Sequence, residues 1–229
     1  QLQQPYTDVG CPRLMPEPAR AMNELQERRR LLQPACPHPT PALFLDRDGV
    51  LIEDKHHLCD PEQVVLCQGS QGLVSTAHQQ GWPVVVITNQ SGIARGYFDW
   101  SAYERVTDQL LWQLGESAPL AGIYANGHGP IAPAGSWRKP SPAMLLEAAR
   151  EMNLDLQRSV LVGDRQSDLE AGARAGVQTL VHVKTGHGHK ERAHVAAWGQ
   201  RELQLNAQNH PPELLLLNSL LDFPPALLR

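Results

Sequence analysis

The sequence predicts an α/β domain of three layers, in which helices cover both faces of a central parallel sheet. Short apolar runs rich in β-branched residues alternate along the chain with longer segments of helical periodicity. The apolar runs show no polar alternation, which is typical of strands buried on both faces. Strands that alternate with helices favour right-handed crossovers, and these crossovers build a parallel sheet.

The elements follow one another from residue 42 onwards. The run at 83–87 is rich in valine and indicates a buried strand. At 101–114 the apolar residues share one helical face, and Ser101 with Glu104 fits a capping box. Ser141 followed by proline indicates another helix start. Strands are expected at 42–45, 83–87, 122–125, 159–162 and 179–183, helices at 70–80, 101–114, from 141 and at 167–175, and a packed leucine-rich ending at 213–229.

Residues 1–40 differ in composition from the domain expected at 41–229. They are rich in proline, and we interpret them as an arm that packs on the domain. One helix is expected from about 18 to 32. Arg28, Arg29 and Arg30 would lie near its C-terminal end, where cations suit the helix dipole. A binding patch made of the three arginines is the alternative.

Composition limits the classes of partner. The net charge of −4 argues against nonspecific nucleic-acid binding, which normally needs a basic face. No apolar run is long enough to span a bilayer, and the first residues do not resemble a secretory signal. We therefore expect a cytoplasmic protein that acts on a small anionic metabolite. A monomer is expected, with an oligomer left open.

Polar residues follow the predicted strands, at the edge of the sheet where α/β proteins bind ligands. Asp46 and Asp48 follow the first strand, and a turn at Gly49 can bring both carboxylates to one pocket. Thr88 and the residues after it follow the second strand, and Asp164 follows the fourth. Lys139 precedes the helix expected from residue 141. These side chains are expected to converge on one crevice.

Such a crevice suits phosphate transfer. Clustered carboxylates favour a hard divalent cation such as Mg²⁺. A carboxylate that attacks a phosphate dianion at about 4 Å meets roughly 8 kcal/mol of repulsion at an effective dielectric of about 20. A bound Mg²⁺ and the Lys139 ammonium can offset this repulsion. Attack by Asp46 would divide the displacement into two easier steps, with Asp48 as acid and then base.

Four segments together carry a family resemblance: FLDRDGVL at 44–51, VITNQSGIARG at 86–96, RKPSPAML at 138–145 and LVGDRQSDLEAGARAG at 161–176. In this order and spacing they resemble the haloacid dehalogenase (HAD) superfamily, and within it the branch of heptose bisphosphate phosphatases and histidinol-phosphatases. The resemblance implies a Rossmann-like fold and a Mg²⁺-dependent phosphoric monoester hydrolase.

The resemblance also implies individual roles. Asp46 matches the nucleophile and a Mg²⁺ ligand, and Asp48 matches the general acid/base, whose backbone carbonyl also binds the metal. Thr88 and Lys139 match the phosphate-binding positions. Asp164 matches the remaining Mg²⁺ ligand, and Asp168 supports the metal indirectly. The positions that match substrate-binding stretches are Asp54, Lys55, His56, His57, Asn89, Gln90, Ser91, Arg138 and Arg165.

The sequence departs from that branch at one loop. Relatives often carry a zinc loop that ends in Cys-x-Cys, but Gly135 and Trp137 stand at the corresponding positions here. His128 matches a ligand position, with no cysteine nearby. A structural zinc needs about four nitrogen or sulfur ligands, so we expect no zinc. The intervals between the motifs have no room for a large cap domain, so short loops are expected to cover the pocket.

Several alternatives stay open. The best single expectation for the substrate is D-glycero-D-manno-heptose 1,7-bisphosphate, with histidinol phosphate or another small monoester as the alternative. A noncatalytic scaffold that binds a partner through residues 1–40 is an alternative of another class. Arg165 could form a surface ion pair, and His56 and His57 could belong to a solvated loop. His187, His189 and His194 lie in a polar segment and are expected to be exposed.

Overall fold

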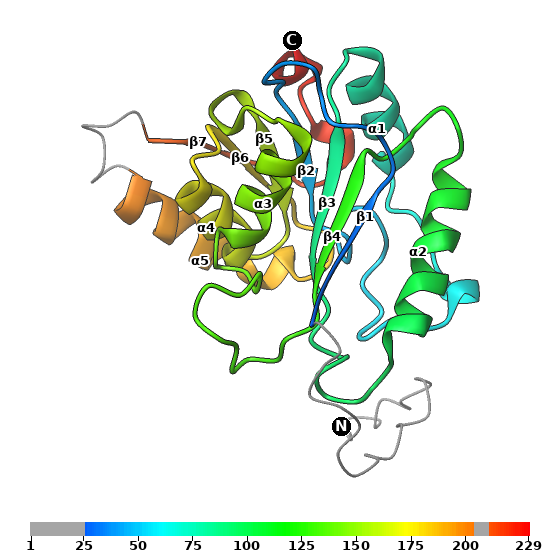
Figure 1. The fold of residues 1–229 in the computed structure, drawn as a ribbon. Helices are drawn as coiled ribbons and strands as arrows, with labels where there is room; N and C mark the ends of the chain where they lie inside the picture. Colours follow the sequence, from blue (N-terminus) through cyan, green and yellow to red (C-terminus); the bar gives the residue numbers. More distant parts are fainter. Residues whose placement is uncertain (1–25, 204–210) are drawn as a thin grey trace, which may run out of the picture.

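The computed structural model describes residues 26–203 and 211–229 and confirms the three-layer α/β architecture (Figure 1). A seven-stranded sheet has the order β1-β4-β3-β2-β5-β6-β7. All neighbouring strands are parallel except β1, which pairs antiparallel with β4. The strands are β1 Glu27–Leu31, β2 Leu43–Leu45, β3 Val84–Asn89, β4 Gly122–Asn126, β5 Val160–Gly163, β6 Thr179–His182 and β7 Glu213–Leu216.

Helices cover both faces of the sheet. The helices are α1 Ser70–Gln79, α2 Trp100–Leu114, α3 Ala143–Met152, α4 Gln166–Ala175 and α5 Gly188–Trp198. Apolar residues of α1 and α2 form one core with one side of the strands, and those of α3, α4 and α5 form a second core with the other side. β2 lies at the centre, and all three of its residues are fully buried. The residues that follow β2 therefore leave the sheet at its middle.

Two helix starts differ from the expected ones. The cap of α2 is Asp99, whose carboxylate accepts from the Ala102 amide, and not Ser101. An aspartate two residues earlier satisfies the same free amides, so the helix begins sooner. The residue before α3 is Pro142, one position later than the expected cap.

The helix expected from about 18 to 32 is wrong where the structure describes it, since residues 27–31 form β1. Residues 18–25 lie outside the described part of the chain. Alternate side chains of β1 point to opposite faces of the sheet. Arg30 pairs with Glu104 and Asp108 of α2, and Arg29 pairs with Glu151 of α3. Acidic groups on both helix layers thus neutralise the arginines of an edge strand, an arrangement that local propensity could not reveal.

The chain end packs as expected. β7 adds to the sheet edge beside β6, and two short 3-10 helices follow at Leu220–Asp222 and Pro225–Leu228. Leu220, Phe223 and Leu228 are buried in the core under α1 and α2. No helix among the described residues is both long enough and apolar enough to cross a bilayer.

Candidate active site

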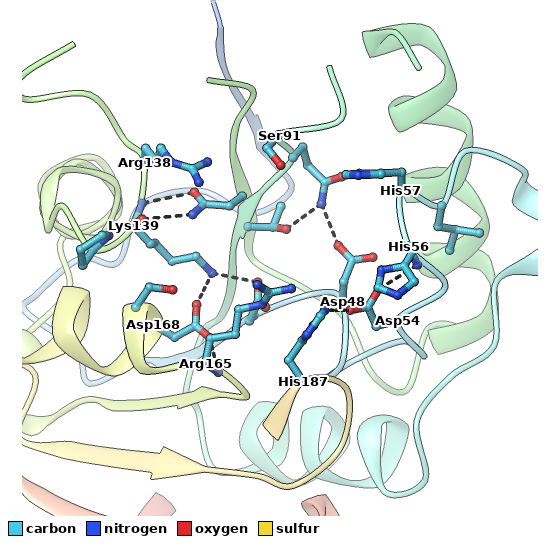
Figure 2. A pocket seen from close by; sticks show the side chains of 17 residues that line it. Asp48, Asp54, His56, His57, Ser91, Arg138, Lys139, Arg165, Asp168 and His187 are labelled. Atoms are coloured by element: carbon cyan, nitrogen blue, oxygen red, sulfur yellow. Dashed lines mark hydrogen bonds and ion pairs between the residues drawn. The ribbon is translucent and has the colours of Figure 1, made fainter. Parts of the chain in front are cut away.

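A pocket of about 360 Å³ opens beyond the carboxyl ends of β2 and β3, and the start of α4 closes one side of it (Figure 2). It collects nearly all the side chains that the sequence singled out. Its walls are formed by Asp46, Asp48, Asp54, His56, His57, Leu58, Thr88, Asn89, Gln90, Ser91, Arg138, Lys139, Pro140, Arg165, Ser167, Asp168 and His187. Asp164 is fully buried and is not part of the wall. The parallel sheet therefore brings the four motifs together.

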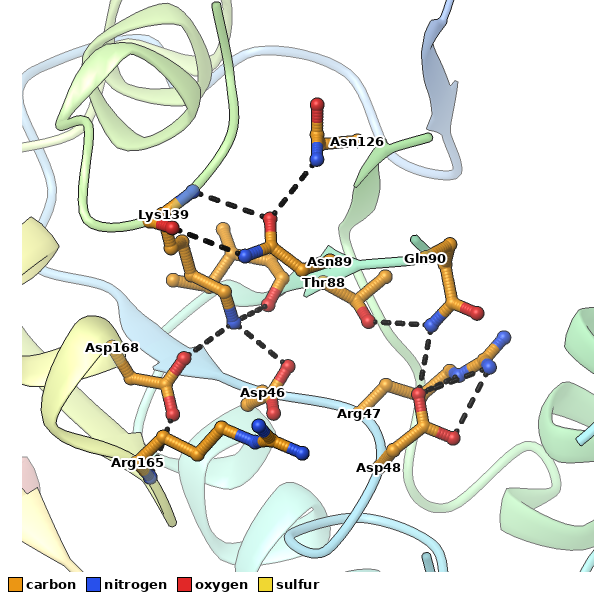
Figure 3. Close-up of polar contacts among 11 residues, drawn as sticks. Asp46, Arg47, Asp48, Thr88, Asn89, Gln90, Asn126, Lys139, Arg165 and Asp168 are labelled. Carbon is orange, nitrogen blue, oxygen red and sulfur yellow. Dashed lines mark hydrogen bonds and ion pairs between the residues drawn. The ribbon is translucent and has the colours of Figure 1, made fainter. Parts of the chain in front are cut away.

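The Lys139 side chain lies on the pocket floor, where its ammonium pairs with two carboxylates (Figure 3). Its ammonium lies 2.9 Å from Asp46 Oδ1 and 2.6 Å from Asp168 Oδ1, and it donates to the Ile87 carbonyl at 3.0 Å. Only 3% of Lys139 is exposed. Burial alone would lower its pKa, but Asp168 and Asp46 outweigh this and raise the pKa above its usual value. Lys139 is therefore a fixed cation beside the Asp46 carboxylate.

Three carboxylates meet beneath the pocket. One oxygen each of Asp46, Asp164 and Asp168 lies within 4.8 Å of the others. Burial, together with the neighbouring carboxylates, raises the pKa of Asp46 to about 7 and that of Asp164 to about 9. Asp164 Oδ1 is buried without a hydrogen-bond partner. An all-oxygen donor set with an unpartnered buried oxygen fits a magnesium ion.

Asp168 has a different set of partners. Its Oδ2 accepts the Arg165 amide at 3.0 Å in a capping box at the start of α4, and its Oδ1 pairs with Lys139. Both oxygens are thus engaged with the protein. The indirect metal role expected for Asp168 stays a prediction.

Two glycines make room for Asp164. At Gly49, where φ is +88°, a Cβ would lie 2.5 Å from Asp164 Oδ2. A Cβ at Gly186, in the loop after β6, would also clash with this oxygen, and the next amide, of His187, donates to it at 2.6 Å. Thr185 Oγ1 donates to the Gly49 carbonyl at 2.5 Å. The loop at 185–187 thus completes the site, a contribution that the sequence analysis missed. The only available signal was the glycine that follows a predicted strand.

Asp48 is held by a second network. Arg47 Nε and Nη2 reach its two carboxylate oxygens at 3.1 and 3.2 Å. Gln90 Nε2 donates to Asp48 Oδ2 at 2.7 Å and to Thr88 Oγ1 at 2.8 Å. The Arg47 side chain is buried and its guanidinium lies 5.2 Å from the ring centre of Tyr103. Arg47 therefore orients Asp48 from below, a role that the sequence did not suggest.

Asn89 connects two strand ends with the lysine loop. Its Oδ1 accepts the Lys139 amide and the Asn126 side chain, each at 3.2 Å. Its Nδ2 donates to the Lys139 carbonyl at 3.2 Å. The Asn89 side-chain amide, expected to bind substrate, is thus engaged with the protein and fixes the backbone of Lys139.

Arg138 and Ser91 form another part of the pocket wall (Figure 2). Arg138 Nη1 donates to the His128 carbonyl at 3.0 Å. Burial, and then the charges of Arg95 and Arg165, lower the pKa of Arg138, so positively charged groups lie near one another here. An excess of positive charge suits an anionic ligand. Lys55 does not line the pocket, and its ammonium donates to the Gln63 carbonyl at 2.9 Å.

Histidines form the opposite wall. His57 stacks on Tyr97 with ring centres 4.5 Å apart. His187 Nε2 lies 2.7 Å from Asp54 Oδ2, and the His187 and His56 ring centres are 5.8 Å apart. The expectation that His187 is simply exposed is wrong, because the loop after β6 folds over the pocket. His189 and His194 are exposed, as expected.

Comparisons with known proteins assign the chain to a family. Residues 58–176 match the haloacid dehalogenase-like hydrolases, and residues 136–220 match the HAD-hydrolase-like group. A D-glycero-beta-D-manno-heptose-1,7-bisphosphate 7-phosphatase from Mesorhizobium japonicum is 47% identical over 62% of this chain and 68% of its own. The enzyme of the same name from Photorhabdus laumondii is 34% identical over 82% of this chain and 95% of its own.

A crystal structure supports the same grouping. D,D-heptose 1,7-bisphosphate phosphatase from B. bronchiseptica, complexed with magnesium and phosphate, superposes with a TM-score of 0.65 at 30% identity. The match covers 79% of this chain and 94% of that protein. Sequence, fold and pocket agree, and the chain belongs to the haloacid dehalogenase-like hydrolases.

Proposed function

We propose that this protein is a Mg²⁺-dependent phosphatase that hydrolyses D-glycero-D-manno-heptose 1,7-bisphosphate through an aspartyl-phosphate on Asp46. The observation that supports it best is the Lys139 ammonium, buried between Asp46 and Asp168 beside a three-carboxylate cluster. Asp46 and Asp164 would hold Mg²⁺ with the Asp48 carbonyl, and Asp168 would support them through Lys139. The metal would neutralise charge on the transferring phosphate.

In the first half-reaction, an Asp46 carboxylate oxygen attacks phosphorus, and the bond between phosphorus and the sugar oxygen breaks. Asp48 gives its proton to the departing sugar oxygen. Thr88 would hold a phosphate oxygen during the transfer. The Lys139 ammonium, whose three N–H donors meet Asp46, Asp168 and the Ile87 carbonyl, would stabilise the phosphate through its charge. The network of Arg47 and Gln90 fixes the orientation of Asp48 for this step.

In the second half-reaction, a water attacks the phosphorus of the aspartyl-phosphate. Asp48, now ionised, takes the proton from that water, and the bond between phosphorus and Asp46 breaks. Inorganic phosphate leaves, and both carboxyl groups return to their starting states. One aspartate thus serves as acid and then as base.

A bisphosphate suits the pocket better than a monoester does. Arg138 and Arg165 both line the pocket and add positive charge to that of Lys139. Burial, and then the charges of Arg95 and Arg165, lower the pKa of Arg138. Arg138 and Arg165 would bind the second phosphate, and Asp54, His56, His57 and Ser91 would contact sugar hydroxyls. The relatives named above act at the 7-phosphate, and we propose the same position here.

The test begins with Asp46→Asn. Phosphate release from the heptose bisphosphate, measured with Mg²⁺, is expected to disappear while circular dichroism stays unchanged. Asp108→Asn, on the exposed face of α2, is the matched control and is expected to keep full turnover. Full activity of Asp46→Asn would remove Asp46 as the nucleophile.

A substrate panel tests the specificity. The kcat/KM for the heptose bisphosphate is expected to exceed that for histidinol phosphate. Arg138→Gln should raise KM for the bisphosphate and leave KM for a sugar monophosphate nearly unchanged. A higher kcat/KM for histidinol phosphate would favour the alternative function. We further propose a monomer in the cytoplasm, which sedimentation and cell fractionation would test.

A further inference from the structure

A second cluster of metal-binding side chains lies in the histidine wall of the pocket, apart from the carboxylates around Asp46 (Figure 2). Asp54, His56 and His187 each present one ligand atom, and the three atoms lie within 4.8 Å of one another. All three residues also line the pocket. We propose that these residues form a second metal site, selective for an imidazole-preferring ion such as Zn²⁺.

The ligand spacing fits a compact ion. Asp54 Oδ2 and His187 Nε2 are 2.7 Å apart. Tetrahedral zinc with ligand bonds of about 2.0–2.1 Å separates its ligand atoms by about 3.3 Å, so the pair would open by about 0.6 Å. The ion would take the place of the proton between the two atoms, with the imidazole proton on Nδ1. The ligand atom of His56, which lies within 4.8 Å of the other two, would move towards the ion to complete the set.

The two loops that carry these ligands are anchored independently of any metal. The amide of His56 donates to Asp54 Oδ1 at 2.9 Å, which orients the carboxylate. The amide of His187 donates to Asp164, and the neighbouring Thr185 hydroxyl bonds to the Gly49 carbonyl. The backbone on both sides of the cluster is thus fixed, so an ion would meet ligands that are already close together.

Ligand chemistry separates this site from the carboxylate site. Oxygen-only ligands suit Mg²⁺, whereas two imidazoles and one carboxylate suit zinc and its neighbours in the first transition series. Three protein ligands leave a fourth position for water on the pocket side. This proposal departs from the expectation of no zinc. That expectation was argued from the missing cysteines at 135 and 137, which lie in a different loop.

The test is a Zn²⁺ titration of the full chain by calorimetry in excess Mg²⁺, which keeps zinc from the carboxylates of Asp46 and Asp164. One Zn²⁺ is expected to bind, and Co²⁺ in its place should give the absorption of a tetrahedral centre. His187→Ala and His56→Ala should each weaken zinc binding by at least about tenfold. His189→Ala, an exposed histidine on α5, is the matched control and should change it by less than about twofold.

Absence of zinc binding in the wild type would overturn the proposal. Zinc binding that persists in both histidine variants would overturn it as well, above all if Asp46→Asn abolishes it. Circular dichroism of each variant separates lost ligands from lost folding. The readout needs no turnover, so a negative result leaves the proposed phosphatase activity untouched.

Discussion

Replacing Lys139 by methionine removes the buried cation and keeps a side chain of similar length. The ammonium lies 2.9 Å from Asp46 and 2.6 Å from Asp168, and almost no water reaches it. The variant therefore leaves two buried carboxylates facing each other without a cation. Both folding and phosphate transfer should suffer, and for the same electrostatic reason.

The magnitude follows from these distances. At an effective dielectric of about 20, each ion pair is worth about 6 kcal/mol of attraction. The desolvation of the buried lysine offsets much of this, so loss of one partner of a buried ion pair typically costs about 3–5 kcal/mol. We expect the free energy of unfolding to fall by about 3 kcal/mol or more without Mg²⁺, and by less with Mg²⁺. The kcat should fall by about 10²–10³-fold, as for the loss of one preorganised donor.

Urea unfolding with and without Mg²⁺ measures the first effect, and phosphate release at saturating substrate measures the second. Lys184→Met provides the control, because Lys184 is exposed and should change stability by less than about 0.5 kcal/mol. A Lys139→Met protein with wild-type stability and turnover would refute the electrostatic reasoning. If Mg²⁺ recovered no stability, the metal would not share the charge of this cluster.

Three further predictions concern the framework of the site. Asn89→Ala removes the side chain that pairs with the backbone amide and carbonyl of Lys139. The free energy of unfolding should fall by about 1–3 kcal/mol, and kcat should fall as well. An unchanged kcat would show that these two hydrogen bonds are not needed for turnover. Gly49 has a positive φ, and Gly49→Ala would place a methyl group 2.5 Å from Asp164 Oδ2. Because this displaces a carboxylate expected to bind Mg²⁺, the Mg²⁺ concentration for half-maximal activity should rise. An unchanged concentration would contradict this prediction. Because the folded pKa values of Asp46 and Asp164 rise from 3.8 to about 7 and about 9, the metal-free folded state keeps protons that the unfolded chain releases. The stability of the metal-free protein should therefore fall as the pH increases towards those values. The difference in Tm between protein with Mg²⁺ and protein with EDTA should grow from pH 5 to pH 9 in the wild type. In Asp164→Asn the same difference should grow less.

The sequence was sufficient to predict the parallel sheet and the convergence of its acidic strand ends. Buried strands such as β3 are apolar on both faces, and this pattern is local. Residues that follow parallel strands share one edge of the sheet, so the sequence alone was enough to place Asp46, Thr88 and Asp164 together.

Features that depend on distant partners could not be predicted. β1 contains three consecutive arginines, whose acidic partners lie on α2 and α3, far along the chain. The position of His187 depends on how the loop after β6 folds back to Asp164. The role of Arg47 depends on burial beside Tyr103, and nothing in the residues next to Arg47 indicates it. In each case the deciding contact joins separate parts of the sequence.

The edge strand β1 also supports the loop at 127–137. The Gln26 carbonyl accepts the Gly127 amide at 2.5 Å, and the Glu27 carboxylate accepts the Trp137 amide at 2.7 Å, so two adjacent residues tie down both ends of this loop. Arg138, beside the second tie, reaches back to His128 inside the same loop. A protein shortened to begin at residue 41, where composition suggests a border, would lack both ties and should lose substrate affinity before it loses its fold. A shortened protein should therefore retain Gln26 and Glu27.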